Sequence, residues 1–173
     1  MTEIYHANIT GDAHRATVKT LFEEYLLWAN GKLEEHFDIS FNIPEMIAGD
    51  MATLEKFTPP KGHLLLADLD GEMAGLACIR QIRDDVAEIK RMYVRPTYRR
   101  RGVGRDLVQA AIDVSRKDGY RAVFLDSARF MTAAHALYQS CGFELFEEYP
   151  ESEIPPQFRE NWVFMRYLLS GSD

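Results

Sequence analysis

A basic loop that contains two glycines, set between a strand-like and a helix-like segment, is the feature that most constrains the fold. Residues 86–94 have the pattern of a strand, and Pro96 cannot continue a strand ladder. Residues 103–118 carry apolar side chains at the three- and four-residue spacing of one helical face. A short apolar run at 122–125 follows, and its strand is expected to lie parallel to residues 86–94 through a right-handed crossover. The chain is therefore predicted to build a mixed α/β sheet.

Two further strands precede this unit. The runs 63–69 and 72–83 are strand-like, and they are joined by Asp70-Gly71, a pair that tolerates the positive φ angles of a tight turn. Together with residues 86–94 they predict three consecutive antiparallel strands between positions 63 and 94.

The other segments fit a single domain, predicted as residues 1–169 with a short flexible tail at 170–173. A helix is expected to begin with Asp12 as its N-cap and to end near Asn30-Gly31. The remaining expected elements are a strand at 2–9, a helix after Asn42 that ends before Pro59-Pro60, a helix at 132–141 and a last strand at 162–169.

Composition excludes several classes of protein. No apolar run approaches the roughly 20 residues of a membrane helix, and the start of the chain lacks a signal-peptide profile, so a soluble cytoplasmic protein is expected. Cys78 and Cys141 are too few for a disulfide framework or a zinc cage, and no metal site is expected.

The charge is unevenly distributed. The formal net charge is −7, but the stretch from Glu88 to Arg105 has seven basic residues against one acid, so this stretch carries +6 and the rest of the chain −13. This contrast favours a local anion site on an acidic protein over a surface that coats nucleic acid.

The position of the basic loop predicts which anion it binds. A helix N-terminus exposes backbone N–H groups, glycines let an anion approach them closely, and arginines add charge-assisted hydrogen bonds, so phosphate is the expected ligand. The dinucleotide fingerprint G-x-G-x-x-G fails because Leu107 stands at its third glycine, and the P-loop pattern is absent from the chain.

What the loop does match is the spacing R-x-x-G-x-G, at Arg99, Gly102 and Gly104. This motif resembles the pyrophosphate-binding loop of the GNAT superfamily of acyl-CoA-dependent N-acetyltransferases. A second segment, Ala134 to Phe143, resembles the superfamily's A-x-x-L-Y-x-x-x-G-F helix and turn, and the resemblance covers residues 64–143. It implies a mostly antiparallel twisted sheet, splayed between its fourth and fifth strands and flanked by about four helices.

The resemblance also implies a cosubstrate, acetyl-CoA, with no metal. The strand end before the loop would pair with the pantetheine amides, and the loop would hold the pyrophosphate. The residues expected to bind acetyl-CoA are Met92, Tyr93, Val94, Arg99, Arg100, Arg101, Gly102, Val103, Gly104, Arg105 and Ala134. Met131 stands where the superfamily often has asparagine, and Ser127, Thr132 or water is expected to replace that contact.

Two residues are implied for catalysis. Glu88 matches the glutamate that serves as base in some members, although other members use another base or water, and an exposed glutamate paired with Lys90 or Arg91 is the structural alternative. Tyr138 matches the residue whose hydroxyl protonates the departing thiolate, and its alternative is a core aromatic. His135 is expected to be a solvated helix residue.

For the acceptor, the superfamily draws its pocket from the first helix and the loop near the C-terminus. The candidate residues are Tyr25 and Trp28, then Glu24, His36, Phe37 and the acidic loop 147–153. The leading prediction is transfer of acetyl directly to a primary amine of a small molecule or peptide. The rival is a non-catalytic acyl-CoA sensor or interaction module on the same fold. No nucleic-acid or membrane partner is expected, and an exposed edge strand near the C-terminus could support a homodimer.

Overall fold

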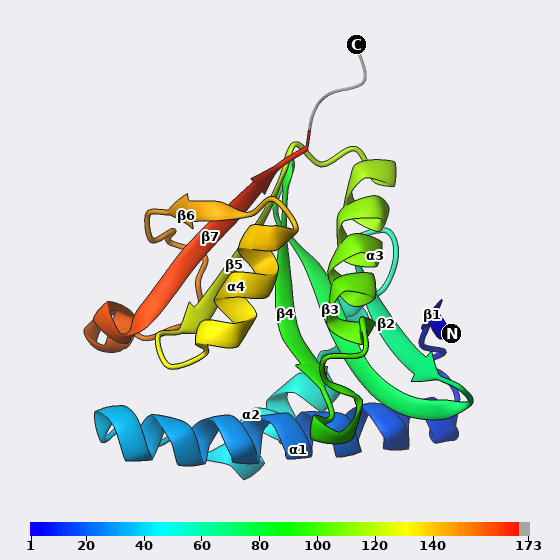
Figure 1. Cartoon of the computed structure of the whole chain (residues 1–173), viewed down its shortest axis with the longest axis horizontal. Helices are drawn as coiled ribbons and strands as arrows, with labels where there is room; N and C mark the ends of the chain where they lie inside the picture. The colour runs from blue at the N-terminus through cyan, green and yellow to red at the C-terminus, as the bar shows by residue number, and fades with distance from the viewer. Residues whose placement is uncertain (170–173) are drawn as a thin grey trace.

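Seven strands form one mixed sheet in the order β1-β2-β3-β4-β5-β7-β6 in the computed structural model, which describes residues 1–169 (Figure 1). The tail predicted at 170–173 lies outside the described residues. β4 and β5 pair in parallel, and the other neighbouring strands pair antiparallel. The strands are β1 (Thr2–His6), β2 (Gly62–Leu69), β3 (Glu72–Arg83), β4 (Val86–Val94), β5 (Ala122–Ala128), β6 (Glu144–Phe146) and β7 (Trp162–Leu168). The predicted mixed α/β sheet, with its three-stranded meander, is confirmed.

Helices cover both faces of this sheet. The α-helices are α1 (Asp12–Phe37), α2 (Ile43–Ala52), α3 (Val103–Lys117) and α4 (Thr132–Ser140), with short 3-10 turns at Leu54–Phe57, Pro96–Tyr98 and Pro156–Asn161. β2 shows why both faces need cover, because its side chains alternate between two cores. Leu65 and Ala67 pack with α3 residues, whereas Leu64 and Leu66 pack with α1 residues.

The divergence of β4 from β5 determines where a site can form. The two strands pair only from Val86 to Glu88 on β4 and from Ala122 to Phe124 on β5. Figure 1 shows them close together at one end of the sheet and separating toward α1. The predicted splay between the fourth and fifth strands is therefore confirmed. Beyond Glu88, the edge of β4 that faces β5 has no strand partner within residues 1–169.

Two predictions for α1 are wrong. The helix continues through Gly31 to Phe37 and is closed by Asp38 in a left-handed conformation. A glycine inside a helix costs only about 1 kcal/mol relative to alanine, and burial of Leu33 in the core beneath it favours continuation. The N-cap is Gly11 rather than Asp12, which occupies the first turn, where its charge favours the helix dipole.

The short strand β6 is not foreseen by the sequence, because three residues give no readable alternation. It pairs with β7 and forms the edge of the sheet. Across the described part of the chain, each helix is too short or too polar to cross a lipid bilayer.

Candidate functional site

Two adjoining cavities lie where β4 and β5 diverge. The larger, here called the groove, has a volume of about 690 Å³ and follows the end of β4, the basic loop and α4. The smaller, here called the side cavity, has a volume of about 270 Å³ and is lined by parts of α1, α2, β4 and β5. Six residues line both cavities and mark the junction between them: Tyr25, Lys90, Arg91, Asp126, Ser127 and Met131. A molecule lying in the groove can therefore reach the mouth of the side cavity.

One end of the groove is built to hold an anion. The first backbone hydrogen bond of α3 runs from Asp106 N–H to Gly102 C=O, so the N–H groups of residues 103–105 have no acceptor within the helix. Arg100 and Gly102 take left-handed conformations, with φ of 60° and 94°, the kind of backbone geometry that lets N–H groups converge on an anion. This end of the groove offers backbone donors, a helix dipole and arginine side chains to one ligand.

A side chain at Gly104 would crowd its neighbours at the edge of the groove. A Cβ at this position would lie 3.0 Å from Leu137 Cδ2 and 3.8 Å from Met92 Cε, both of which border the groove. Glycine at this position therefore lets α3 pack closely on α4, and Gly104 itself lines the groove. A diphosphate fits this cradle, and the residues present are suited to the pyrophosphate of coenzyme A.

All but two of the residues predicted to bind acetyl-CoA line the groove. These are Met92, Tyr93, Val94, Arg99, Arg100, Gly102, Gly104, Arg105 and Ala134. The side chains of the other two point elsewhere. Arg101 donates a hydrogen bond to Asp70 at 3.2 Å, and Val103 is buried in the core under α3.

Besides Arg101, three more of the seven basic residues that make up the +6 stretch do not belong to the anion site. Arg95 makes a two-pronged hydrogen-bonded pair with Glu24, at 2.7 Å from Nη2 and 2.9 Å from Nε. Lys90 and Arg91 are paired with carboxylates from other elements, as described below. The sequence count treats these three as neighbours of the loop arginines, but β4 and the residue that follows it direct them to partners far away in the chain. Glu24 is thereby held by Arg95 and does not line either cavity.

The end of β4 presents backbone to the groove. Its register with β3 shifts between Leu76, opposite Tyr93, and Cys78, opposite Lys90. Arg91, at the shift, has a φ of 50°, so β4 contains a bulge that changes the direction of the following residues. Past the bulge, Met92, Tyr93 and Val94 lie beside the groove, where an extended ligand could pair with the strand.

Tyr138 lies deep in the groove. Its side chain is 7% exposed, and its hydroxyl lies 3.6 Å from Met92 Sδ. Burial, with smaller contributions from nearby acidic and phenolic groups, raises the pKa of Tyr138 above its usual value, so the phenol keeps its proton at neutral pH. The group can therefore supply a proton to a leaving group in the groove.

The region around Met131 is as polar as expected. Ser127 and Thr132 both line the groove. His135 is not simply solvated, because its Nε2 lies 3.0 Å from Ser127 Oγ and burial lowers the pKa of its imidazole. Ser127 and Thr132 therefore lie beside the groove, and the replacement of the missing amide contact by one of them or by water stays a prediction.

Glu88 lies outside both cavities. Its side chain is fully buried, accepts a hydrogen bond from Arg80 Nε at 2.6 Å and another from the Tyr149 hydroxyl at 2.7 Å. Burial raises the pKa of Glu88, against the opposing effect of Lys90 and Arg80. The exposed pairing with Lys90 or Arg91, considered as the structural alternative, is wrong. The role of Glu88 as base stays a prediction.

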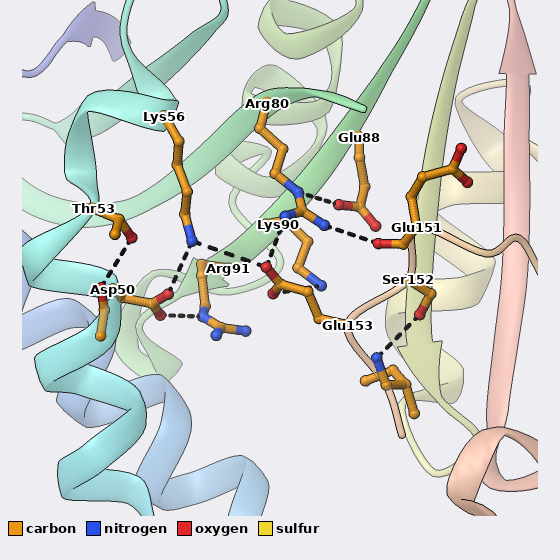
Figure 2. A network of polar contacts seen from close by, with 12 residues as sticks. Asp50, Thr53, Lys56, Arg80, Glu88, Lys90, Arg91, Glu151, Ser152 and Glu153 are labelled. Carbon is orange, nitrogen blue, oxygen red and sulfur yellow. Dashed lines mark hydrogen bonds and ion pairs between the residues drawn. The ribbon is translucent and has the colours of Figure 1, made fainter. Parts of the chain in front are cut away.

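A charged network borders the side cavity (Figure 2). Glu153 joins three of its members, because it lies 2.7 Å from Arg80 Nη1, 3.5 Å from Lys90 Nζ and 4.0 Å from Lys56 Nζ. Asp50 pairs with Arg91 at 2.7 Å and with Lys56 at 3.5 Å, and Asp126 lies 3.7 Å from Lys90. The network therefore holds four basic and four acidic side chains: Lys56, Arg80, Lys90 and Arg91, with Asp50, Glu88, Asp126 and Glu153.

This network controls the ionisation of its members. Burial by itself would raise the pKa of Glu153, but Lys90, Arg80 and Lys56 lower it to about 2. Burial would likewise lower the pKa of Lys90, and Asp126, Glu88 and Glu153 raise it instead. Sequence reasoning missed the network, because its members come from α2, the 3-10 turn after it, three strands and the loop before β7. The available signal was charge inside apolar strands, at Lys90 and Asp126.

The predicted acceptor-binding residues divide into two groups. Tyr25 and Trp28 line the groove, and the Arg99 guanidinium lies 5.3 Å from the Trp28 ring centre. His36 and Phe37 pack on Phe130 and do not line either cavity. In the acidic loop 147–153, Glu153 lines the side cavity and Tyr149 is buried. Among residues 1–169, no group of three or more His, Cys, Asp or Glu side chains is arranged to hold a metal ion.

Comparison with known proteins places this geometry in a family. A family model described as the acetyltransferase (GNAT) family matches residues 22–143. An uncharacterized N-acetyltransferase of Schizosaccharomyces pombe is 34% identical over 155 residues, which cover 88% of this chain and 86% of that protein. N-acetylaspartate synthetase of Rattus norvegicus is 33% identical over 97 residues, which cover 54% of this chain and only 32% of that larger protein.

Solved structures agree on the fold. An acetyltransferase from Streptococcus agalactiae superposes with a TM-score of 0.73 at 20% identity, covering 97% of this chain and 98% of that one. An N-acetyltransferase from Thermoplasma acidophilum, crystallised with coenzyme A, gives a TM-score of 0.73 at 18% identity, covering 98% and 99%. The groove, the glycine-bearing cradle and the family match agree, and this chain belongs to the GNAT family of acetyltransferases.

Proposed function

We propose that this protein transfers the acetyl group of acetyl-CoA directly to a primary amine, with both substrates bound at once. The observation that carries the proposal is the junction of the two cavities, where a groove with a phosphate cradle opens into a second cavity. A thioester held along the groove and an amine held in the side cavity would meet there. Holding two reactants in this way can supply several kcal/mol of the barrier reduction.

Acetyl-CoA supplies an activated acyl group with a thiol as its leaving group. The α3 N-terminus and Arg99, Arg100 and Arg105 bind the phosphates, and the backbone of Met92 to Val94 aligns the pantetheine arm. A free backbone N–H at the end of β4 polarises the thioester carbonyl.

The bond changes balance as follows. The ammonium first gives one proton to a carboxylate or to water. The neutral amine nitrogen then bonds to the acetyl carbon, the carbon–sulfur bond breaks, Tyr138 gives its proton to the sulfur, and the second proton of the nitrogen passes to solvent as the amide forms. Tyr138 regains its proton from solvent. Because an alkylammonium has a pKa of about 10.4, removal of its first proton, before the attack, is an essential part of the reaction.

Two carboxylates are candidates for accepting this proton. The family resemblance favours Glu88, and the positions of the side chains favour Asp126, which lines both cavities. The variants Glu88→Gln and Asp126→Asn separate them, because loss of the base lowers kcat about 100-fold and removes the basic rise in the pH–rate profile. If both variants keep the wild-type profile, water rather than either carboxylate carries the proton.

The test of the proposal begins with calorimetric titration of acetyl-CoA. Gly104→Asp puts a carboxylate in the cradle, and we expect it to weaken binding at least about 100-fold. Gly31→Asp is the matched control, since a side chain at this exposed helical glycine meets nothing within 4 Å. Folded wild-type protein that does not bind acetyl-CoA would exclude the transferase function.

Release of coenzyme A thiol is then measured with a panel of amines. Turnover with any amine distinguishes an enzyme from the rival, a non-catalytic acyl-CoA sensor. Binding of acetyl-CoA with no turnover of any amine would favour the sensor.

A further inference from the structure

The side cavity has two chemically different halves. One half is mostly apolar, with Asn30 of α1 as a polar member, and its apolar side chains come from α1, α2, the loop between them and β7: Leu26, Leu33, Phe41, Ile43, Met46 and Trp162. The other half, at the junction with the groove, carries Lys90, Arg91, Asp126 and Glu153. Its two cations and two anions leave this half without net charge. A ligand that fits both halves has opposite charges at one end and an apolar group at the other.

The cations at the junction, Arg91 and Lys90, can each make a further polar contact with a ligand. Within residues 1–169, Arg91 is recorded as donating only through Nε, to Asp50 at 2.7 Å, and Figure 2 shows its two terminal nitrogens drawn without a partner. Lys90 Nζ lies 3.5 and 3.7 Å from its carboxylates, longer than the roughly 2.7–2.9 Å of a close charge-assisted hydrogen bond. Both cations are held in place by the network but remain able to accept a carboxylate from a ligand.

Asp126 offers the opposite charge to the same ligand. Its Oδ2 accepts a hydrogen bond from Ser152 Oγ at 2.8 Å and faces Lys90, while no hydrogen bond within the described residues is recorded for Oδ1. The side chain is 7% exposed and lines both cavities, so it lies where an amine must meet the groove. Because Asp126 and Lys90 are 3.7 Å apart, a ligand with ammonium and carboxylate on one carbon can reach both.

We propose that the acceptor is a free α-amino acid with an apolar side chain. Its ammonium binds Asp126, its carboxylate binds Arg91 and Lys90, and its side chain fills the apolar half of the side cavity. This proposal rests on the proposed function and names the acceptor class for it. The side cavity has a suitable size for this acceptor. Its volume of about 270 Å³ equals about nine water volumes at ~30 Å³ each, which suits an amino acid better than a peptide.

The same features disfavour other amines. A polyamine brings a second ammonium to Lys90 and Arg91, and a peptide N-terminus has an amide where the carboxylate belongs. An amino acid with an acidic side chain places a second carboxylate in the apolar half, where no cation lines the cavity among the described residues.

The first experiment uses the unmodified protein with acetyl-CoA. Thiol release and mass spectrometry of the product are followed for leucine, methionine and phenylalanine, and for leucinamide, alanine, aspartate and spermidine. We expect kcat/KM for at least one of the large apolar amino acids to exceed that of leucinamide and of aspartate at least tenfold, since leucinamide leaves a buried cation without its partner.

A second experiment tests the apolar half. Met46→Trp reduces the space for the acceptor side chain, so kcat/KM should fall at least tenfold for leucine and change less than about threefold for alanine. Ala48→Trp on the same helix is the control, because its side chain is exposed and does not line either cavity. A general loss of stability would lower kcat/KM for leucine and for alanine together, so the ratio of these two kcat/KM values is the informative measurement.

The outcomes separate this proposal from the function on which it rests. Efficient acetylation of spermidine, leucinamide or aspartate, with weak acetylation of the apolar amino acids, overturns the acceptor class and leaves the transferase standing. Absence of turnover with every amine overturns both the acceptor class and the proposed transferase function.

Discussion

The groove and the side cavity are built by opposite means, although they share a junction. The groove is formed largely by one continuous segment, from Met92 to Arg105, with α4 beside it, and its binding groups are mostly backbone N–H groups and exposed arginines. The side cavity is formed by side chains from α1, α2, β4, β5 and the loop before β7. A ligand shared by a whole family can be bound by a local backbone pattern, whereas an acceptor specific to one protein requires contacts assembled from distant parts of the chain.

The charges of the two regions differ for the same reason. The loop arginines Arg99, Arg100 and Arg105 are available to an anion from solvent. The cations beside the side cavity are largely buried and are balanced by an equal number of acids. Burial without such balance would cost several kcal/mol per ion, so the network must remain paired to be tolerated. Removing a charge from the groove should therefore weaken only the binding of its ligand. Removing a charge from the network beside the side cavity should also lower the stability of the fold.

The largest expected effect comes from breaking the buried network. Arg80→Met leaves Glu88 fully buried without its arginine, and we expect a loss of about 3–5 kcal/mol in the free energy of unfolding. The loss should shrink at lower pH, where Glu88 takes up a proton. Urea denaturation at several pH values measures both effects.

Arg83→Met is the matched control for this variant. Arg83 lies on the same strand and also pairs with a glutamate, Glu151, but the pair is 42% and 30% exposed and should contribute less than about 1 kcal/mol. Equal losses in the two variants would contradict the distinction drawn between the buried network and the surface.

A second prediction concerns Tyr138, which lies in the groove and is proposed to act in the chemical step rather than in binding. Tyr138→Phe should lower kcat about 100-fold and leave the Kd of acetyl-CoA unchanged, because only the proton donor is removed. Tyr120→Phe, another largely buried tyrosine outside both cavities, should keep wild-type kcat. An unchanged kcat in Tyr138→Phe would make this residue a core aromatic.

A third, smaller effect is the pH dependence that Glu153 gives to the network. Its pKa of about 2 in the folded protein is below the usual value of 4.5, so its charge stabilises the fold above pH 4.5. That stabilisation is lost as the pH falls from 4.5 toward 2. The difference in urea midpoint between wild type and Glu153→Gln should therefore narrow over this range.

The loss of stability per pH unit that Glu153 can cause has an upper limit. One proton gives at most about 1.4 kcal/mol per pH unit, and the 40% exposure of the Glu153 side chain reduces this further by solvent screening. A difference that stays constant between pH 5 and 3 would show that Glu153 is not held ionised by its neighbours.

Features built by one continuous segment could be predicted from the sequence, whereas features assembled from distant parts of the chain could not. Periodicity and turn residues predict the meander and the crossover helix, because these depend on neighbours in the chain, whereas the splay of the sheet is predicted only through the family resemblance. They fail at Gly31, where tertiary packing of Leu33 overrides a local stop signal. The basic loop is correct as a motif, yet Lys90, Arg91 and Arg95 are wrongly grouped with it, since their partners lie tens of residues away. Asp50 and Glu153 carry no motif at all.

The smallest effect expected is at the edge of the groove, and it tests whether individual loop arginines are interchangeable. Arg100 and Arg101 are adjacent and both exposed, but Arg100 lines the groove and Arg101 turns to Asp70. An exposed charged contact contributes about 0.5–1 kcal/mol, so Arg100→Gln should raise the Kd of acetyl-CoA roughly two- to fivefold. Arg101→Gln should leave it within about 1.5-fold, and added salt should reduce the difference, because the contact is screened by ions. If the two variants weaken binding equally, the loop acts through its summed charge, and the orientation of its side chains matters less than the backbone cradle at Gly104.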